Sequence, residues 1–302
     1  MKRWILAAVA LALVIAIAWP FLFGGPTVEV KGASFAVEHR TGDDGPMSRR
    51  SPTRERPALA AGSAILCSWD RDRYLYFWSE GSRATFDVAF LDAGGKVLQV
   101  GRMRAYRGAD ILDDEGLASE VEARHALFMP EGTTDNLGLA IGDAVALSSG
   151  LAGATPDPMT VVKVAGKEVR VTLCETLKER RRGLMHRPKM SKDEGMLFLY
   201  RSARTGLNYY MRNTLMSLDI AYFDGNGRLV NAASTQRAEN PATQGVRLDA
   251  PADGSAQFVL EMPIGWFREN GLVDAAGKPV KSPTLEIPET VRKRLPTAEE
   301  QQ

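Results

Sequence analysis

The sequence is poor in the residues that build metal centres and disulfide frameworks. Its 302 residues include two cysteines, Cys67 and Cys174, and three histidines, His39, His125 and His186. None of these is spaced from another as metal ligands usually are, so we expect no metal site and no cofactor. Both cysteines stand in apolar runs, where small thiols commonly pack in strands. We therefore predict two buried free thiols in preference to one disulfide.

An excess of charge of one sign is also missing. The chain has 38 Lys and Arg against 37 Asp and Glu, a formal net charge of +1. Nucleic-acid-binding proteins carry a clear basic excess, so this balance excludes nucleic acid as a partner. The catalytic motifs G-x-S-x-G and H-E-x-x-H and a glycine-rich phosphate loop are absent as well. These absences argue against an enzyme, with no residue assigned a catalytic role.

One long hydrophobic run is present, near the N-terminus. The 20 uncharged residues from Trp4 to Phe23 follow Lys2 and Arg3. As a helix they would span about 30 Å, enough to cross a bilayer and longer than the apolar part of most signal peptides. We predict a signal anchor over residues 1–25 in the cytoplasmic membrane, with the body in the periplasm or outside. The alternative is a cleaved signal peptide, which leaves the body secreted or periplasmic.

The rest of the sequence contains one pattern twice. Residues 76–97 match residues 208–229, each position lying 132 further along, and residues 127–132 match residues 260–265 at an offset of 133. Two matched blocks in the same order indicate a duplicated domain.

The boundary between the copies falls where Ser, Gly, Ala, Thr and Pro replace the apolar pattern. We predict a first copy over residues 26–150, a second over 159–281 and a tail over 282–302.

Short strands joined by tight turns dominate both copies. Residues 218–223 alternate as a strand does, and Asp224-Gly225-Asn226-Gly227 predicts a hairpin turn that residues 92–95 repeat in the first copy. Residues 175–185 predict a short amphipathic helix. The sequence therefore predicts a mainly β chain, a β-sandwich or barrel-like domain with short helices in each copy.

Four motifs of the second copy occur in a characteristic order. They are RGLMHR at residues 182–187, GMLF at 195–198, YMRNT at 210–214 and LDI at 218–220. This segment resembles the bacterial and archaeal family named domain of unknown function 192. The resemblance implies a compact, mostly β, often exported domain, and it brings no established reaction.

The first copy has lost most of this signature. Gly81 and Ser82 stand where the second copy has Asn213 and Thr214. Residues 45–49 are all that we identify of the GLM-x-R segment. The first copy is therefore a degenerate one.

Comparison of the copies separates structural from functional candidates. Asp87 and Asp219 persist in both copies inside apolar strands, so we predict structural roles in which they accept backbone N–H bonds or pair with arginine. The ligand-binding candidates occur only in the second copy: Arg182, Arg187, Tyr210, Arg212, Asn213 and Thr214.

Arginine and tyrosine side chains suit anionic or carbohydrate ligands, because the guanidinium fork matches carboxylates, phosphates and sugar hydroxyls. We therefore expect a non-enzymatic protein that binds an envelope glycan or an anionic small molecule. One alternative is a structural or protein-interaction module, in which Arg187 pairs with Asp219. Another is a hydrolase using the carboxylates Glu261 and Asp219, or His186 with Asp219 or Asp224.

Overall fold

The computed structural model describes residues 25–41, 52–108, 114, 116–152, 160–237, 248–249, 255–274, 278, 280 and 284–296. The predicted anchor from Trp4 to Phe23 lies outside these ranges. No helix within them is long and apolar enough to cross a membrane. The chain divides into two compact units, one built mainly from residues up to Pro158 and the other mainly from Met159–Gln302.

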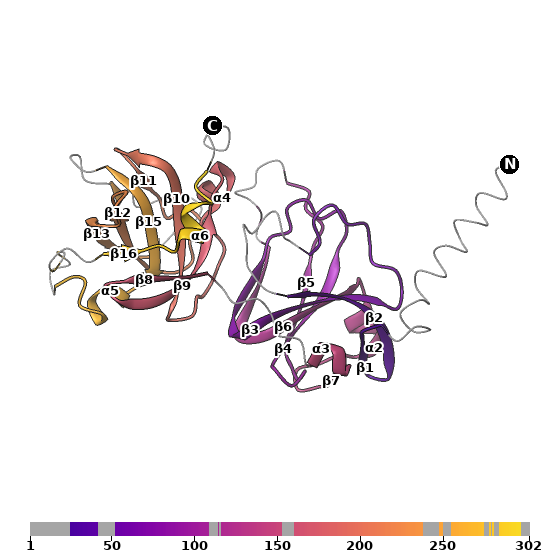
Figure 1. Cartoon of the computed structure of the whole chain (residues 1–302). Coiled ribbons are helices and arrows are strands. Elements are labelled where there is room, and N and C mark those ends of the chain that lie inside the picture. Colours follow the sequence, from indigo (N-terminus) through magenta and orange to yellow (C-terminus); the bar gives the residue numbers. More distant parts are fainter. Residues whose placement is uncertain are drawn as a thin grey trace. The chain divides into compact units, whose positions relative to one another are not determined.

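Within its described residues, the first unit is one seven-stranded sheet with two short helices (Figure 1). Its strands follow the order β5-β4-β6-β3-β2-β1-β7 across the sheet. The elements are β1 (Thr27–Val30), β2 (Ala33–Thr41), β3 (Ser63–Phe77), β4 (Phe86–Leu91), β5 (Val97–Met103), β6 (Leu117–Pro130), α2 (Thr133–Leu137), β7 (Val145–Leu147) and α3 (Ser149–Ala152).

The second unit repeats this plan with the order β13-β12-β15-β10-β9-β8-β16. Its sheet contains β8 (Thr160–Val164), β9 (Lys167–Cys174), β10 (Glu194–Arg204), β12 (Leu218–Phe223), β13 (Leu229–Thr235), β15 (Ala256–Pro263) and β16 (Leu285–Glu286). A separate two-stranded sheet pairs β11 (Asn208–Tyr209) with β14 (Leu248–Asp249), and the helices are α4 (Leu177–Arg182), α5 (Trp266–Glu269) and α6 (Glu289–Arg292).

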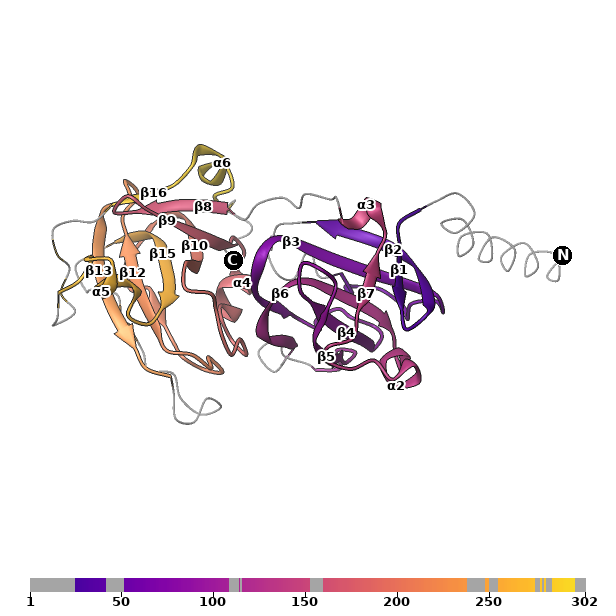
Figure 2. The same cartoon turned by 90° about the horizontal axis from the view of Figure 1, so that it is seen from below.

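The two sheets correspond strand for strand. Figure 2 shows β13, β12, β15 and β10 following one another across the second sheet, as β5, β4, β6 and β3 do in the first. Both sheets also have a parallel pair of neighbouring strands at the same place. The pair is β2 with β3 in the first sheet and β9 with β10 in the second. The prediction of a mainly β chain with two related domains is confirmed.

The local predictions are confirmed as well. The predicted turns at residues 92–95 and 224–227 join β4 to β5 and β12 to β13. The helix predicted over residues 175–185 is α4, which is shorter because Gly183 ends it. Cys67 and Cys174 are both buried free thiols.

The last strand of each copy links the two ends of its sheet. The amide of Val145 donates to the carbonyl of Gly95, and the amide of Leu285 donates to that of Gly227. A side-chain carbon at either glycine would collide with the carbonyl oxygen of Val145 or Leu285. Each hairpin therefore needs glycine at this position, where both a positive φ and a close backbone approach are required.

Both faces of the second sheet are buried. One core contains Leu260 and Phe267, and the other contains Phe198, Ile220 and Tyr222. Leu184 and Met211 come from two loops that carry the family-like motifs, and they pack in the second of these cores. We call the face of the sheet that bears this core the loop-covered face. A candidate site on this face is therefore shaped by the residues that distinguish the second copy.

Candidate functional site

A pocket of about 180 Å³ opens beside α4 in the second unit. Four of its lining residues are arginines, and none of the described lining residues is a carboxylate. The lining residues are Leu177, Arg180, Arg181, Arg182, Gly183, Leu184, Met185, Tyr200, Arg204, Asn208, Tyr209, Tyr210 and Thr214.

The helix that supplies three of these arginines is fixed at its N-terminus by a capping box. The Thr176 hydroxyl accepts a hydrogen bond from the amide of Glu179, and the Glu179 carboxylate accepts one from the amide of Thr176 at 2.9 Å. Such reciprocal caps satisfy amides that a helix start leaves open. The cap thereby fixes where α4 begins and which side chains it presents to the pocket.

Arg180 is held in place by neutral groups. Its guanidinium donates to the carbonyl oxygens of Glu175 at 2.6 Å and Leu199 at 3.1 Å, and it lies 5.0 Å from the centre of the Tyr200 ring. Carbonyls and an aromatic face orient a guanidinium without cancelling its charge. The positive charge of Arg180 is therefore part of the pocket wall.

Two family-like loops meet through a pair of left-handed residues. His186 and Asn213 have φ of 60° and 54°, and the amide of His186 donates to the carbonyl of Asn213 at 2.7 Å. Asparagine tolerates this conformation better than most residues. The left-handed backbone at position 213 thus favours asparagine there.

The first copy keeps the same loop contact with different side chains. Glu55 has φ of 56°, and its amide donates to the carbonyl of Gly81, the counterpart of Asn213, at 2.6 Å. The counterpart of the GLM-x-R segment in the first copy is therefore residues 52–56. The segment that the sequence identified, residues 45–49, lies outside the described residues.

The pocket brings together three of the six predicted ligand residues. Arg182, Tyr210 and Thr214 line it, and the Tyr210 hydroxyl donates to the carbonyl of Arg181 at 3.0 Å. The other three, Arg187, Arg212 and Asn213, are absent from the described lining. Arg187 is buried.

Two tyrosines that sequence reasoning did not identify, Tyr200 and Tyr209, line the pocket. The hydroxyls of Tyr200 and Tyr209 are 2.9 Å apart and share a hydrogen bond. The Tyr209 ring packs edge-on against Phe198 and Tyr222. Burial raises the pKa of both phenols, so they remain protonated and able to donate.

Glu261 lies on the loop-covered face with these tyrosines. It is 6% exposed, and its Oε2 has no hydrogen-bond partner among the described residues. Burial raises its pKa to about 8. Glu261 is paired in register with Ile220, so Asp219, the next residue, points to the opposite face of the sheet. The carboxylate pair considered for a hydrolase is therefore not formed, because the strand alternation separates its members.

Asp219 instead serves the fold. Its carboxylate accepts hydrogen bonds from the amide of Phe267 at 2.9 Å and from the hydroxyl of Ser234 at 2.6 Å. Phe267 lies in the first turn of α5, so Asp219 satisfies an amide that this helix start leaves open.

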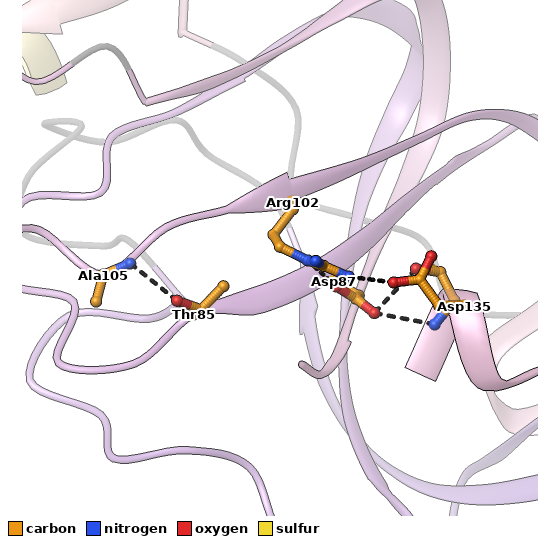
Figure 3. A network of polar contacts seen from close by, with 6 residues as sticks. Thr85, Asp87, Arg102, Ala105 and Asp135 are labelled. Carbon is orange, nitrogen blue, oxygen red and sulfur yellow. Dashed lines mark hydrogen bonds and ion pairs between the residues drawn. The ribbon is translucent and has the colours of Figure 1, made fainter. Parts of the chain in front are cut away.

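Asp87 has the same position in the first copy. It accepts hydrogen bonds from the amide of Thr134 in α2 at 2.9 Å and from Arg102 at 2.7 Å, and Arg102 also reaches Asp135 (Figure 3). Burial alone would raise the pKa of Asp87, but these hydrogen bonds outweigh it and hold the pKa below its usual value. Both aspartates therefore have the same helix-holding contact.

The chain matches the profile of domain of unknown function 192 (DUF192; Uncharacterized ACR) over residues 31–147 and again over 160–280. A crystal structure of a protein of unknown function from Novosphingobium aromaticivorans DSM 12444 is 29% identical, with a TM-score of 0.34 over 42% of this chain and 83% of that one. A candidate transcription regulator from Sinorhizobium meliloti 1021 is 22% identical, with a TM-score of 0.34 over 43% of this chain and 96% of that one. Because both TM-scores are low, we draw nothing further from these two structures. No curated protein matches the chain. The two matched ranges cover well over half of the sequence, and the chain therefore belongs to the domain of unknown function 192 family, of which it carries two copies in tandem.

Proposed function

We propose that the second domain binds a small anionic ligand in the pocket beside α4. The observation that carries this proposal is the composition of the wall, four arginines with no carboxylate among the described lining residues. Guanidinium groups bind carboxylates and phosphates through paired, charge-assisted hydrogen bonds. A pocket of about 180 Å³ is smaller than most drug-binding cavities, so the ligand is of monosaccharide size.

The charge requirement is tested by calorimetric titration of the full chain with two matched pairs of compounds. The first pair is glucuronate and glucose, and the second is cyclohexanecarboxylate and cyclohexylmethanol. We expect at least one carboxylate to bind at least about tenfold more tightly than its neutral partner, since charge-assisted hydrogen bonds contribute about 1.5–3 kcal/mol. Equal affinity within both pairs would overturn the proposal.

The position of the site is tested by two exposed arginines. Arg181→Gln combined with Arg204→Gln removes two charges from the pocket wall while leaving the buried residues in place. The matched control is Arg201→Gln, an exposed residue on the same strand as Arg204 that is not part of the lining. We expect the double variant to lose the affinity for the carboxylate and the control to keep it.

We also propose that the protein is exported and held at the cytoplasmic membrane by the run from Trp4 to Phe23. The support is the sequence: 20 uncharged residues after Lys2 and Arg3. A fusion of residues 1–30 to alkaline phosphatase, which is active only outside the cytoplasm, tests the export. Activity in the membrane fraction supports an anchor, activity in the soluble fraction indicates cleavage, and an inactive fusion overturns the export.

A further inference from the structure

Three neighbouring positions on the loop-covered face differ in chemistry between the two copies. In the first copy they hold Trp69, Phe77 and Phe128, which pack on one another as aromatic rings. The centre of the Phe77 ring lies 4.8 Å from that of Phe128 and 5.9 Å from that of Trp69. Phe128 therefore packs at its position in the first copy without a polar group.

In the second copy the same three positions hold Tyr200, Tyr209 and Glu261. The offset of 132 places Tyr209 on Phe77, the offset of 133 places Glu261 on Phe128, and the strand register places Tyr200 on Trp69. The hydroxyl of Tyr209 and the carboxyl group of Glu261 thus replace apolar rings, and the phenol of Tyr200 replaces an indole. Both tyrosines line the pocket beside α4.

The carboxyl group of Glu261 is close enough to both tyrosines to act on them electrostatically. It contributes to the raised pKa of Tyr200 and of Tyr209, after the larger effect of burial. A buried carboxyl with an unpartnered oxygen is unfavourable for the fold. The presence of Phe128 at this position in the first copy shows that the topology is compatible with an apolar residue here, so the fold does not require the carboxyl group.

The two phenols have hydrogen-bonding capacity left over. Their mutual hydrogen bond uses one of the two hydroxyl hydrogens, so the second hydrogen and the remaining oxygen lone pairs can serve a ligand. These are uncharged groups, unlike the arginines of the same lining. The pocket lining therefore combines cations with neutral hydroxyls.

We propose that Tyr200 and Tyr209 form a hydrogen-bonding wall and that the ligand is a hydroxylated carboxylate such as a sugar acid. Its carboxylate binds the arginines and its hydroxyls bind the two tyrosines. Glu261, which is buried on the same face of the sheet, is a positioning residue. This inference rests on the proposed anion binding, because it assigns further residues of the same pocket.

The test compares glucuronate with cyclohexanecarboxylate in calorimetric titrations of the full chain. Both compounds carry a carboxylate on a six-membered ring, and only glucuronate carries hydroxyls. We expect the native protein to prefer glucuronate by about tenfold, as expected for one or two additional net hydrogen bonds. The variant Tyr200→Phe, Tyr209→Phe keeps both rings, and we expect it to lose this preference while binding cyclohexanecarboxylate as before.

Unchanged binding of cyclohexanecarboxylate also shows that the variant is folded. Equal affinity for the two carboxylates in the native protein would overturn the wall, as would a tyrosine variant that weakens both alike. Failure of both carboxylates to bind would instead overturn the proposed anion binding.

Glu261 is tested by the pH dependence of glucuronate binding. An ionised Glu261 would repel the ligand carboxylate, so affinity should fall as the pH rises through about 8, and Glu261→Gln should bind equally at pH 7 and pH 9. A native protein with the same profile as the variant would show that Glu261 does not act on this wall. Among the described residues, the ionisable groups that interact electrostatically with one another here are Cys174 on β9, Tyr200 on β10, Tyr209 on β11, Tyr222 on β12, Glu179 and Arg180 on α4, and Arg187 in the following loop.

Discussion

Buried acids on β12 and β15 have opposite surroundings. The carboxylate of Asp219 accepts hydrogen bonds from an amide and a hydroxyl, whereas Oε2 of Glu261 has no partner among the described residues. Hydrogen-bond donors stabilise the ionised form of a buried carboxyl, and their absence favours the protonated form. Asp219 and Glu261 are both buried acids, but they therefore have different effects on the free energy of unfolding.

Replacement of Glu261 by glutamine should stabilise the protein in a pH-dependent way. The pKa of Glu261 in the folded protein, about 8, lies above the 4.5 of an exposed glutamate. The stability that Glu261 contributes is therefore fully present below pH 4.5 and is lost as the pH rises through about 8. At pH 8 we expect Glu261→Gln to unfold at a higher urea concentration than the native protein. The free energy of unfolding should increase by on the order of 1–4 kcal/mol.

At pH 4 the difference between Glu261→Gln and the native protein should shrink towards the effect of the amide alone. Glu168→Gln, an exposed position on β9, is the control and should show no such trend. A stability difference that stays constant from pH 4 to pH 8 would contradict the raised pKa.

Asp87 and Asp135 contact the same guanidinium from opposite environments, so they make a matched pair. Asp87 is fully buried and Asp135 is exposed, and both accept from Arg102 (Figure 3). Asp87→Asn places a donor against the amide of Thr134 and should destabilise the protein by about 2–4 kcal/mol. Asp135→Asn loses only a solvated ion pair and should change little. Urea denaturation of the two variants measures the difference, and equal effects would contradict the helix-holding role of Asp87.

The last strand of each sheet, β7 or β16, packs closely against a glycine. We call β7 and β16 the closing strands. Gly227 and Gly166 have nearly the same backbone conformation, with φ of 78° and 77°. A side-chain carbon at Gly166 meets nothing within 4 Å, whereas one at Gly227 collides with the carbonyl of Leu285 in β16.

Gly166→Ala should therefore cost only the strain of the left-handed backbone, about 1 kcal/mol. Gly227→Ala should cost about 2–4 kcal/mol, because it also displaces β16. Thermal unfolding of both variants gives the comparison, and equal losses would show that β16 does not need this close approach.

The sequence predicted those elements whose signals are local. The turn at residues 224–227, its repeat at residues 92–95 and the helix near Glu179 follow from patterns within a few residues. The parallel pairing of β9 with β10 was not predictable, because the contact depends on register between segments about 20 residues apart along the chain.

The site was only partly predictable for the same reason. Arg182 belongs to the RGLMHR motif, and Tyr210 and Thr214 belong to the YMRNT motif. Tyr200, in contrast, comes from the middle of an apolar strand. Glu261 alternates with Leu260 and Met262, which is the pattern of a strand with one solvated face. Both faces of this sheet are buried in the structure. The alternation therefore predicts an exposed acid where Glu261 is in fact buried.

Each unit of the chain has a separate hydrophobic core and sheet. We expect the two units to unfold as two transitions in scanning calorimetry of the full chain. Gly95→Ala should lower the midpoint of one transition and Gly227→Ala that of the other, by roughly 4 °C per kcal/mol. A variant that lowers both midpoints together would show that the chain unfolds as one cooperative unit.

The position of the closing strands along the chain bears on how the protein is made. Residues 145–147 complete the first sheet and residues 285–286 complete the second, and in each case they pair with or contact the opening hairpin of the same copy. A ribosome therefore releases every strand of the first sheet before the second copy begins. Until its last strand emerges, each nascent sheet exposes an unpaired edge on β1 or β8, and such edges are prone to aggregate. Synthesis in two successive blocks limits this exposure to one copy at a time.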